Sequence, residues 1–229
     1  MLSRRLRGRL VRHHLPIASA AIVTGWTLYV TRPFPDVLTR LSFATAYPAL
    51  VLLAISLAIG PLRILAGRQP VMSLDLRRDF GIWAGITGVF HAVIGQFVHL
   101  RGRPWLYYIY EDWRARLLPV RHDLFGFANY SGLVSVLVLA VLLLTSNDLS
   151  LRRLGGTEWK GLQRWNYVCF GLAALHGLLY QLGIESQKLP FVLLAIACIA
   201  VTTVLQWAGW RQRRLQRTTS SRAVAGGGA

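Results

Sequence analysis

Acidic residues are scarce in this chain of 229 residues, which has nine Asp and Glu against 26 Lys and Arg. None of these carboxylates lies near the middle of a long apolar run. Ion pumps and proton-coupled carriers usually place an acidic side chain within the membrane, so the scarcity argues against both classes. The sequence also has no P-loop, no glycine-rich strand-to-helix turn, no HExxH zinc motif and no Ser/His/Asp arrangement. We therefore expect neither nucleotide binding nor hydrolysis, and any electrons must arrive from another molecule.

Cysteine is equally rare. The two cysteines, Cys169 and Cys198, both fall inside apolar runs, which predicts packing as small apolar side chains rather than disulfide formation or metal binding. The first apolar run, 15–31, follows a basic start as a signal peptide would, but it has no convincing small-residue cleavage site at its far end. We interpret it as a retained first span.

Apolar residues are what the chain has in abundance, at 54% of the total. Six runs approach the length of helix that crosses the roughly 30 Å hydrocarbon core of a bilayer, and none alternates as a barrel strand does. The runs are 15–31, 42–60, 80–100, 124–145, 165–183 and 190–210. The sequence therefore predicts an all-α fold, a six-span transmembrane helical bundle over 15–210. A basic segment 1–14 precedes it, and a basic tail 211–229 with no ordering pattern follows.

The net charge of +17 could suggest a nucleic-acid partner, but the basic residues sit at the ends of the predicted spans. Eighteen of them fall in the amino-terminal segment, the second and fourth connections and the tail, against eight on the other side. The positive-inside rule then places both termini in the cytoplasm. Anionic lipid explains the charge better than nucleic acid, so we expect no nucleic-acid partner.

Two histidines interrupt apolar runs, in "GITGVFHAVIGQF" (85–97) and "GLAALHGLLYQ" (171–181). His91 follows Arg78 by 13 residues, and His176 follows Arg164 by 12. Both imidazoles are therefore expected roughly 18–20 Å from the cytoplasmic boundary, on two parallel spans. Either histidine alone could be a structural hydrogen-bonding group. Two at one depth, on helices that can face each other, favour axial ligation of a haem by both imidazoles.

Small residues accompany both histidines at spacings that share a helix face. Close packing between membrane helices is one interpretation, and a slot for a macrocycle is the other, which the paired histidines favour. The residues are Ala84, Gly88 and Gly95 beside His91, and Cys169, Ala173 and Gly183 beside His176.

His99 is expected near the outer surface together with Arg101 and Arg103. It is either an interfacial residue or a hydrogen-bond partner of an outward haem propionate, assisted by the two arginines. The stretch 101–123, which we call the external stretch, is rich in aromatic residues. It suits the membrane–water boundary, and we expect a short interfacial helix there.

The remaining three histidines carry simpler expectations. We expect His13 and His14 to be solvated or to face lipid, and His122 to pair with the neighbouring Asp123.

The region 76–181 resembles the ferric reductase-like transmembrane domain superfamily, and within it the MsrQ family, the haem-binding membrane subunits of methionine sulfoxide reductase systems. The similar stretches are "LRRDFGIWAGITGVFHAV", "YIYEDWRARLLPVRHDLFGF", "LLLTSNDLSLRRLGGTEWKGLQRWNYV" and "LAALHGLLYQ". The resemblance implies a b-type haem held between spans three and five, with His91 and His176 at the outer ligand positions.

The chain departs from that pattern at the inner ligand positions, which Gln163 and Arg77 occupy. Glutamine and arginine cannot form a pair of haem-iron ligands, so we expect one haem b rather than two. The resemblance admits FMN or a quinone in the inner half. Arg77, Arg78, Arg152, Arg153 and Arg164 could receive a flavin phosphate, although the same arginines are explained as positive-inside anchors.

The predicted function is that of a multi-pass membrane cytochrome in the inner membrane of a bacterium. It would carry electrons from a quinol or a cytoplasmic flavin reductase to an external acceptor, which by resemblance is a periplasmic methionine sulfoxide reductase. The chain would then be the electron-transfer subunit of an oxidoreductase system. Two alternatives stay open: a stand-alone ferric-reductase-like protein that reduces external metal ions, and a non-redox membrane scaffold or carrier whose histidines only pack.

Overall fold

The computed structural model describes residues 4–32, 34–67, 73–184 and 189–226, and within these ranges it is helical and contains no strand. One isolated antiparallel bridge joins Ile109 and Val120. The all-α prediction is confirmed for this part of the chain. Five helices in it are long and apolar enough to cross a membrane: Val37–Leu65, Asp75–Val98, Leu124–Leu144, Asp148–Ile184 and Leu189–Gln216. The chain is therefore a multi-pass membrane protein.

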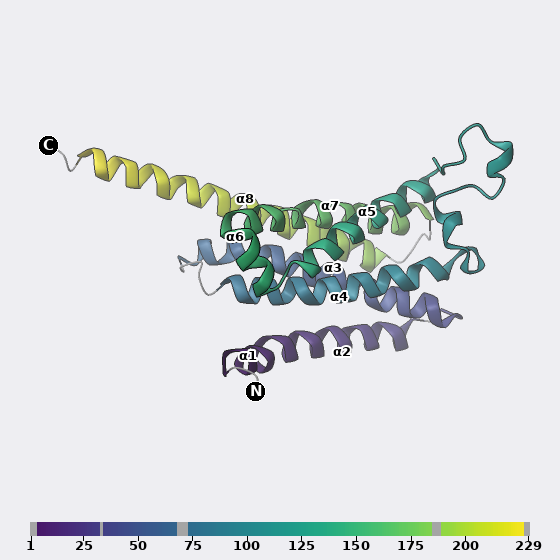
Figure 1. Ribbon diagram of the computed structural model, residues 1–229, viewed down its shortest axis with the longest axis horizontal. Coiled ribbons are helices and arrows are strands. Elements are labelled where there is room, and N and C mark those ends of the chain that lie inside the picture. The colour runs from purple at the N-terminus through teal and green to yellow at the C-terminus, as the bar shows by residue number, and fades with distance from the viewer. Residues whose placement is uncertain (1–3, 33, 68–72, 185–188, 227–229) are drawn as a thin grey trace.

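The sixth predicted span is α2 (Leu15–Thr31), which has 17 residues and is not among those five helices. A short helix α1 (Arg4–Arg9) and a π-helical turn (Leu10–His14) precede it without a break. α2 lies alongside the bundle against α3 (Val37–Leu65) (Figure 1). The count of six spans thus stays a prediction.

Helix α3 packs extensively against both α4 (Ser73–Val98) and α8 (Leu189–Gly226). It begins at Asp36, whose carboxylate accepts hydrogen bonds from the backbone N–H groups of Leu38 (3.2 Å) and Thr39 (2.7 Å). Such a cap satisfies donors that have no partner inside the helix. Leu57 of α3 is fully buried, in the middle of the hydrophobic core that the helices share.

The long helices run roughly side by side, with α4 and α7 (Asn166–Leu179) pointing the same way and α5 (Leu124–Leu144) returning between them (Figure 1). The start of α1 and the far end of α8 lie at the same end of the bundle. This arrangement agrees with two termini on one side of the membrane, and which side that is remains a prediction from charge.

The external stretch does not contain the expected interfacial α-helix. It forms three short 3₁₀ turns, at Leu100–Gly102, Pro104–Tyr107 and Trp113–Ala115. α4 ends at Val98, and the chain then turns at Leu100, whose φ is +57°. Tyr107 is buried and fixes the stretch to α4, because its hydroxyl donates to the carbonyl of Gly95 (2.8 Å) and accepts from the N–H of His99 (2.8 Å).

Two further segments are more helical than expected. The connection before span five is a helix, α6 (Asp148–Gln163), interrupted at Gly155, where φ is +76°. The tail expected to lack order continues α8 as helix through Gly226. Extending an existing helix needs no new nucleation, and Arg, Gln, Leu and Ala are good helix formers.

Candidate functional site

The structure brings His91 of α4 and His176 of α7 together, as expected from their matched depths. The centres of the two imidazole rings are 6.3 Å apart and their planes are inclined by 69°. Both side chains line one cavity inside the bundle. Parallel helices thus place the two rings opposite each other, in the part of the bundle that is predicted to be its outer half.

Hydrogen bonds that the two rings donate to flanking helices define which nitrogen of each imidazole carries the proton. Nδ1 of His91 lies 2.9 Å from the carbonyl oxygen of Ser42 in α3, and Nδ1 of His176 lies 2.8 Å from the carbonyl oxygen of Ala128 in α5. A carbonyl oxygen can only accept, so Nδ1 of each neutral ring must carry the proton. Nε2 is then the nitrogen with the lone pair. Metal-binding histidines commonly donate their other nitrogen in this way.

The spacing of the rings suits a shared metal centre. A metal bound by one nitrogen of each ring needs ring centres about 6 Å apart, because each metal–nitrogen bond is about 2 Å and each ring centre lies about 1 Å behind its nitrogen. Among the described residues, no group of three or more His, Cys, Asp or Glu could hold a bare metal ion. A porphyrin supplies four ligands itself, so two imidazoles are enough for haem.

The cavity has a volume of about 220 Å³ and lies where α4 and α7 separate. In the described part of the chain these two helices contact each other weakly at most, whereas α3 and α5 each contact both. Helices α3 and α5 therefore hold α4 and α7 apart and close the sides of the gap. This is the arrangement that a flat ligand between two axial histidines requires.

Five of the six small residues picked from the sequence line this cavity: Ala84, Gly88, Gly95, Cys169 and Ala173. Gly183 does not, because it packs against Leu124 of α5. Gly88 also serves packing, since a Cβ there would lie 2.6 Å from Cδ2 of Leu139. Both cysteines are free, and Cys169 is buried in the core.

Sequence reasoning missed Gly132 of α5, which contacts His176. A Cβ at this position would lie 2.7 Å from Nδ1 of His176 and 2.9 Å from its Cε1. Gly132 is four residues after Ala128, so a side chain there would cover the carbonyl that accepts from His176. Nothing in the sequence marks this glycine, because its role depends on how α5 meets α7.

Of the three residues expected beside a haem propionate, one lines the cavity, one lies outside it, and the side chain of the third is not described. His99 lines the cavity, and its ring is stacked on Tyr180 with centres 6.2 Å apart. Arg103 is not among the lining residues, is 40% exposed and pairs with Glu111 at 2.5 Å. The side chain of Arg101 lies outside the described residues.

The expectation for His13 and His14 is wrong, because both contact Asp79 of α4. Nδ1 of His13 lies 2.8 Å and Nε2 of His14 lies 3.2 Å from its carboxylate oxygens, and Nε of Arg9 lies 3.0 Å from both. Asp79 is completely buried. The π-helical turn Leu10–His14 widens the helix so that three cationic or polar side chains reach one acid. The carboxylate raises the pKa of the Arg9 guanidinium.

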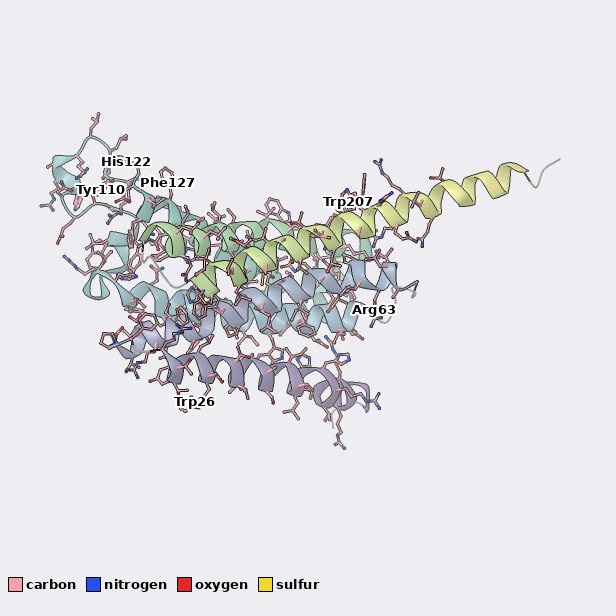
Figure 2. The ribbon with its side chains drawn as sticks, turned by 180° about the vertical axis from the view of Figure 1, so that it is seen from behind. Trp26, Arg63, Tyr110, His122, Phe127 and Trp207 are labelled. Atoms are coloured by element: carbon pink, nitrogen blue, oxygen red, sulfur yellow. The ribbon has the colours of Figure 1, made fainter. Side chains whose placement is uncertain are left out.

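The expected pairing of His122 with Asp123 is also not formed. Asp123 accepts from the guanidinium of Arg121 at 2.5 Å and caps α5 through the N–H of Gly126 at 2.7 Å. Nδ1 of His122 instead lies 3.2 Å from the carbonyl oxygen of Val120, within hydrogen-bonding distance. Figure 2 shows His122 beside Tyr110 in the external stretch, at the end of the molecule opposite Arg63.

The residues at the inner ligand positions have the following surroundings. Gln163 is half-buried, and its Nε2 has no hydrogen bond within the described residues. Arg78 pairs with Asp148 (2.6 Å) and Asp75 (3.5 Å), so its charge is already engaged. No flavin phosphate is needed to explain it.

Fold and site together define a class: a helical, multi-pass membrane protein with a cavity between two facing histidines. Comparison with known proteins narrows this class. The chain is 34% identical over 133 residues to the protein-methionine-sulfoxide reductase heme-binding subunit MsrQ of Deinococcus radiodurans, a match covering 58% of each protein. It is 28% identical over 178 residues to the protein of the same name from Ralstonia nicotianae, covering 78% of this chain and 72% of that protein. These two relatives support an MsrQ-like family.

A third relative, the magnetosome protein MamZ of Magnetospirillum gryphiswaldense, is 29% identical over 132 residues. That match covers 57% of this chain but 18% of MamZ. The chain spans little more than half of the Deinococcus protein, and no family model matches it.

Proposed function

We propose that this chain is a haem-binding membrane subunit of a methionine sulfoxide reductase system in a bacterial inner membrane, holding one haem b between His91 and His176. The observation that supports this most is the geometry of the two imidazoles. Each ring donates Nδ1–H to a helix carbonyl, which leaves Nε2 as the coordinating nitrogen, and the centres are 6.3 Å apart. The two MsrQ relatives are named as heme-binding subunits, which is the same cofactor.

The chain would position the haem and surround it with an apolar environment. The carbonyls of Ser42 and Ala128 fix each ring plane and make the imidazoles stronger electron-pair donors toward a bound metal. Apolar side chains such as Leu53 and Leu139 line the inner part of the cavity and keep water out. When bound, haem supplies one-electron transfer through its iron.

Electrons would enter from a quinol or a cytoplasmic flavin reductase and leave to an external, periplasmic redox protein. Because Gln163 and Arg77 occupy the inner ligand positions, the chain would hold a single haem. FMN or a quinone in the inner half would then shorten the electron path, although the described residues there offer no built site for either.

Haem content of the purified full-length chain tests the proposal. We expect one haem per chain by pyridine haemochrome, with a reduced-minus-oxidised change in the Soret and α bands. His91→Ala and His176→Ala should each abolish the ligand field of a bis-histidine haem. His122→Ala is the matched control, because His122 lies in the external stretch outside the cavity, and it should leave the spectrum unchanged.

Electron delivery forms the second arm of the test. The reduced wild-type protein should be reoxidised by a methionine sulfoxide reductase partner faster than by ferric chelates. Faster oxidation by ferric chelates would identify a metal reductase instead. A protein without haem, or with spectra unchanged in both histidine variants, would leave only a membrane scaffold.

A further inference from the structure

The two histidines share a feature that the proposed function does not use. Each is followed five residues later by a glutamine, in "HAVIGQ" (91–96) and in "HGLLYQ" (176–181). Because α4 and α7 run in the same direction, Gln96 and Gln181 both lie about 7 Å further toward the outer end than their histidines. Both side chains line the cavity that contains the two imidazoles.

Gln181 has hydrogen-bonding capacity that the protein does not use. It is 8% exposed, and its Nε2 donates to the hydroxyl of Tyr47. Its Oε1 is buried and has no hydrogen-bond partner among the described residues. An amide oxygen can only accept, but rotation of this amide by 180° lets Oε1 accept from the Tyr47 hydroxyl and turns both N–H donors to the position that Oε1 occupies. An unsatisfied buried amide costs free energy, so in a cavity wall those N–H groups indicate an acceptor on a ligand.

Gln96 is held in a comparable way on the opposite wall. Its Nε2 lies 3.0 Å and its Oε1 lies 3.3 Å from the same atom, the hydroxyl of Tyr108. One hydroxyl engages only part of an amide that has two N–H donors and two acceptor sites. Each glutamine is therefore oriented by a tyrosine and keeps a second N–H for another acceptor.

Most of the polar groups that line the cavity lie at its outer end, while Ser135, further in, already donates to the carbonyl of Cys169 (2.9 Å). The outer part of the cavity includes Ser42, Asn129 and Tyr180, in addition to the two glutamines. Its inner part is formed by apolar residues such as Ala84 and Leu139. A ligand with a hydrocarbon edge and an acidic edge fits this cavity in one orientation, with the acidic edge outward.

We propose that Gln96 and Gln181 bind the carboxylate edge of the porphyrin, one amide from each wall, and so fix which edge of the macrocycle faces the outer side. This assignment rests on the proposed haem function and replaces Arg103, which is paired with Glu111. Amide N–H groups donating to a carboxylate are charge-assisted and stronger than neutral hydrogen bonds.

The test compares haem with haem dimethyl ester, in which both carboxylates are masked. Full-length chain made without haem is reconstituted with each, and affinity is followed at the Soret band. Gln96→Leu and Gln181→Leu should each weaken binding of haem about tenfold, while leaving binding of the ester nearly unchanged. Gln96→Glu and Gln181→Glu keep the shape of the side chain. Through charge repulsion they should weaken the binding of haem more than the binding of the ester.

Gln206→Leu is the matched control. Gln206 is also a part-buried glutamine with a hydrogen bond, to the carbonyl of Leu57 at 2.7 Å, but it lies outside the cavity. It should leave the ratio of the two affinities unchanged.

The outcomes separate the two proposals. If the wild type binds haem through both histidines but the cavity variants weaken haem and ester equally, or neither, the glutamines do not bind the carboxylates and only this inference fails. If the wild type binds no haem, or binds it independently of His91 and His176, the proposed function and this inference both fail.

Discussion

At the scale of single residues, the candidate site is defined by groups with no chemical reactivity of their own. The carbonyls of Ser42 and Ala128 set the protonation pattern of two imidazoles, and Gly132 leaves the second carbonyl accessible. Backbone atoms and an absent side chain thus decide which nitrogen of each histidine is available to a metal.

Gly132→Ala should displace His176, because the added Cβ would lie 2.7 Å from its Nδ1. Overpacking of this kind costs about 1–3 kcal/mol, and we expect weaker haem retention and an altered Soret band. Gly171→Ala is the control, since a Cβ there has no neighbour within 4 Å. Equal spectra for the two variants would show that Gly132 is not needed for the position of His176.

Asp79→Asn should destabilise the packing of the amino-terminal helix on α4. The substitution removes the charge that Arg9 and the two neighbouring histidines surround in a fully buried position, and breaking such a pair costs about 3 kcal/mol. Thermal unfolding in detergent would measure it. Glu111→Gln, which removes a pair that is 71% exposed on the glutamate side, should cost no more than about 1 kcal/mol.

At the scale of elements, capping residues determine where helices begin at the membrane boundary. Asp36 and Asp123 cap α3 and α5, and Asn147 caps α6. Hydrogen bonds from Arg121 and from the N–H of Gly126 lower the pKa of Asp123 below its usual 3.8. A lowered pKa means that the folded state favours the charged carboxylate.

Asp123→Ala should therefore destabilise the start of α5 by about 1 kcal/mol at neutral pH. Since the folded-state pKa lies below 3.8, the contribution is fully present above that pH and is lost as the pH falls through the lowered pKa. The difference in unfolding free energy between wild type and variant should shrink in acid. A difference that stays constant from pH 7 to strongly acidic conditions would argue against the ionised cap.

At the scale of the whole molecule, the direction of α2 decides how many times the chain crosses the bilayer. α2 has 17 residues, or about 26 Å of helix, and the preceding helical turns lengthen the rod. The start of α1 and the far end of α8 lie at the same end of the bundle. This arrangement agrees with six crossings, and their number stays a prediction.

Reporter fusions at the two termini would test that topology. A reporter active only in the cytoplasm should work at both ends, and it should fail when inserted in the external stretch near Leu117, which is 98% exposed. An inactive amino-terminal fusion beside an active carboxyl-terminal one would reduce the number of spans to five.

Much of the fold could be predicted because membrane spans depend on local properties. The predicted run 15–31 coincides with α2, and 124–145 matches α5 within one residue. α6 was missed as a separate helix, since its amphipathic pattern follows Asn147 in what the sequence presents as a connection. Asp79, which contacts both His13 and His14, was missed as their partner because it lies on another helix, 66 residues from His13.

The sequence alone determined the spans and the matched depth of His91 and His176, because hydropathy and helical rise are counted along the chain. It could not determine which groups meet across the bundle. Only the packing of α3 and α5 between α4 and α7 decided that each imidazole donates to a carbonyl, that Gly132 touches His176, and that two glutamines share a cavity. Those contacts depend on how separate helices approach each other, and that information is not local to any segment.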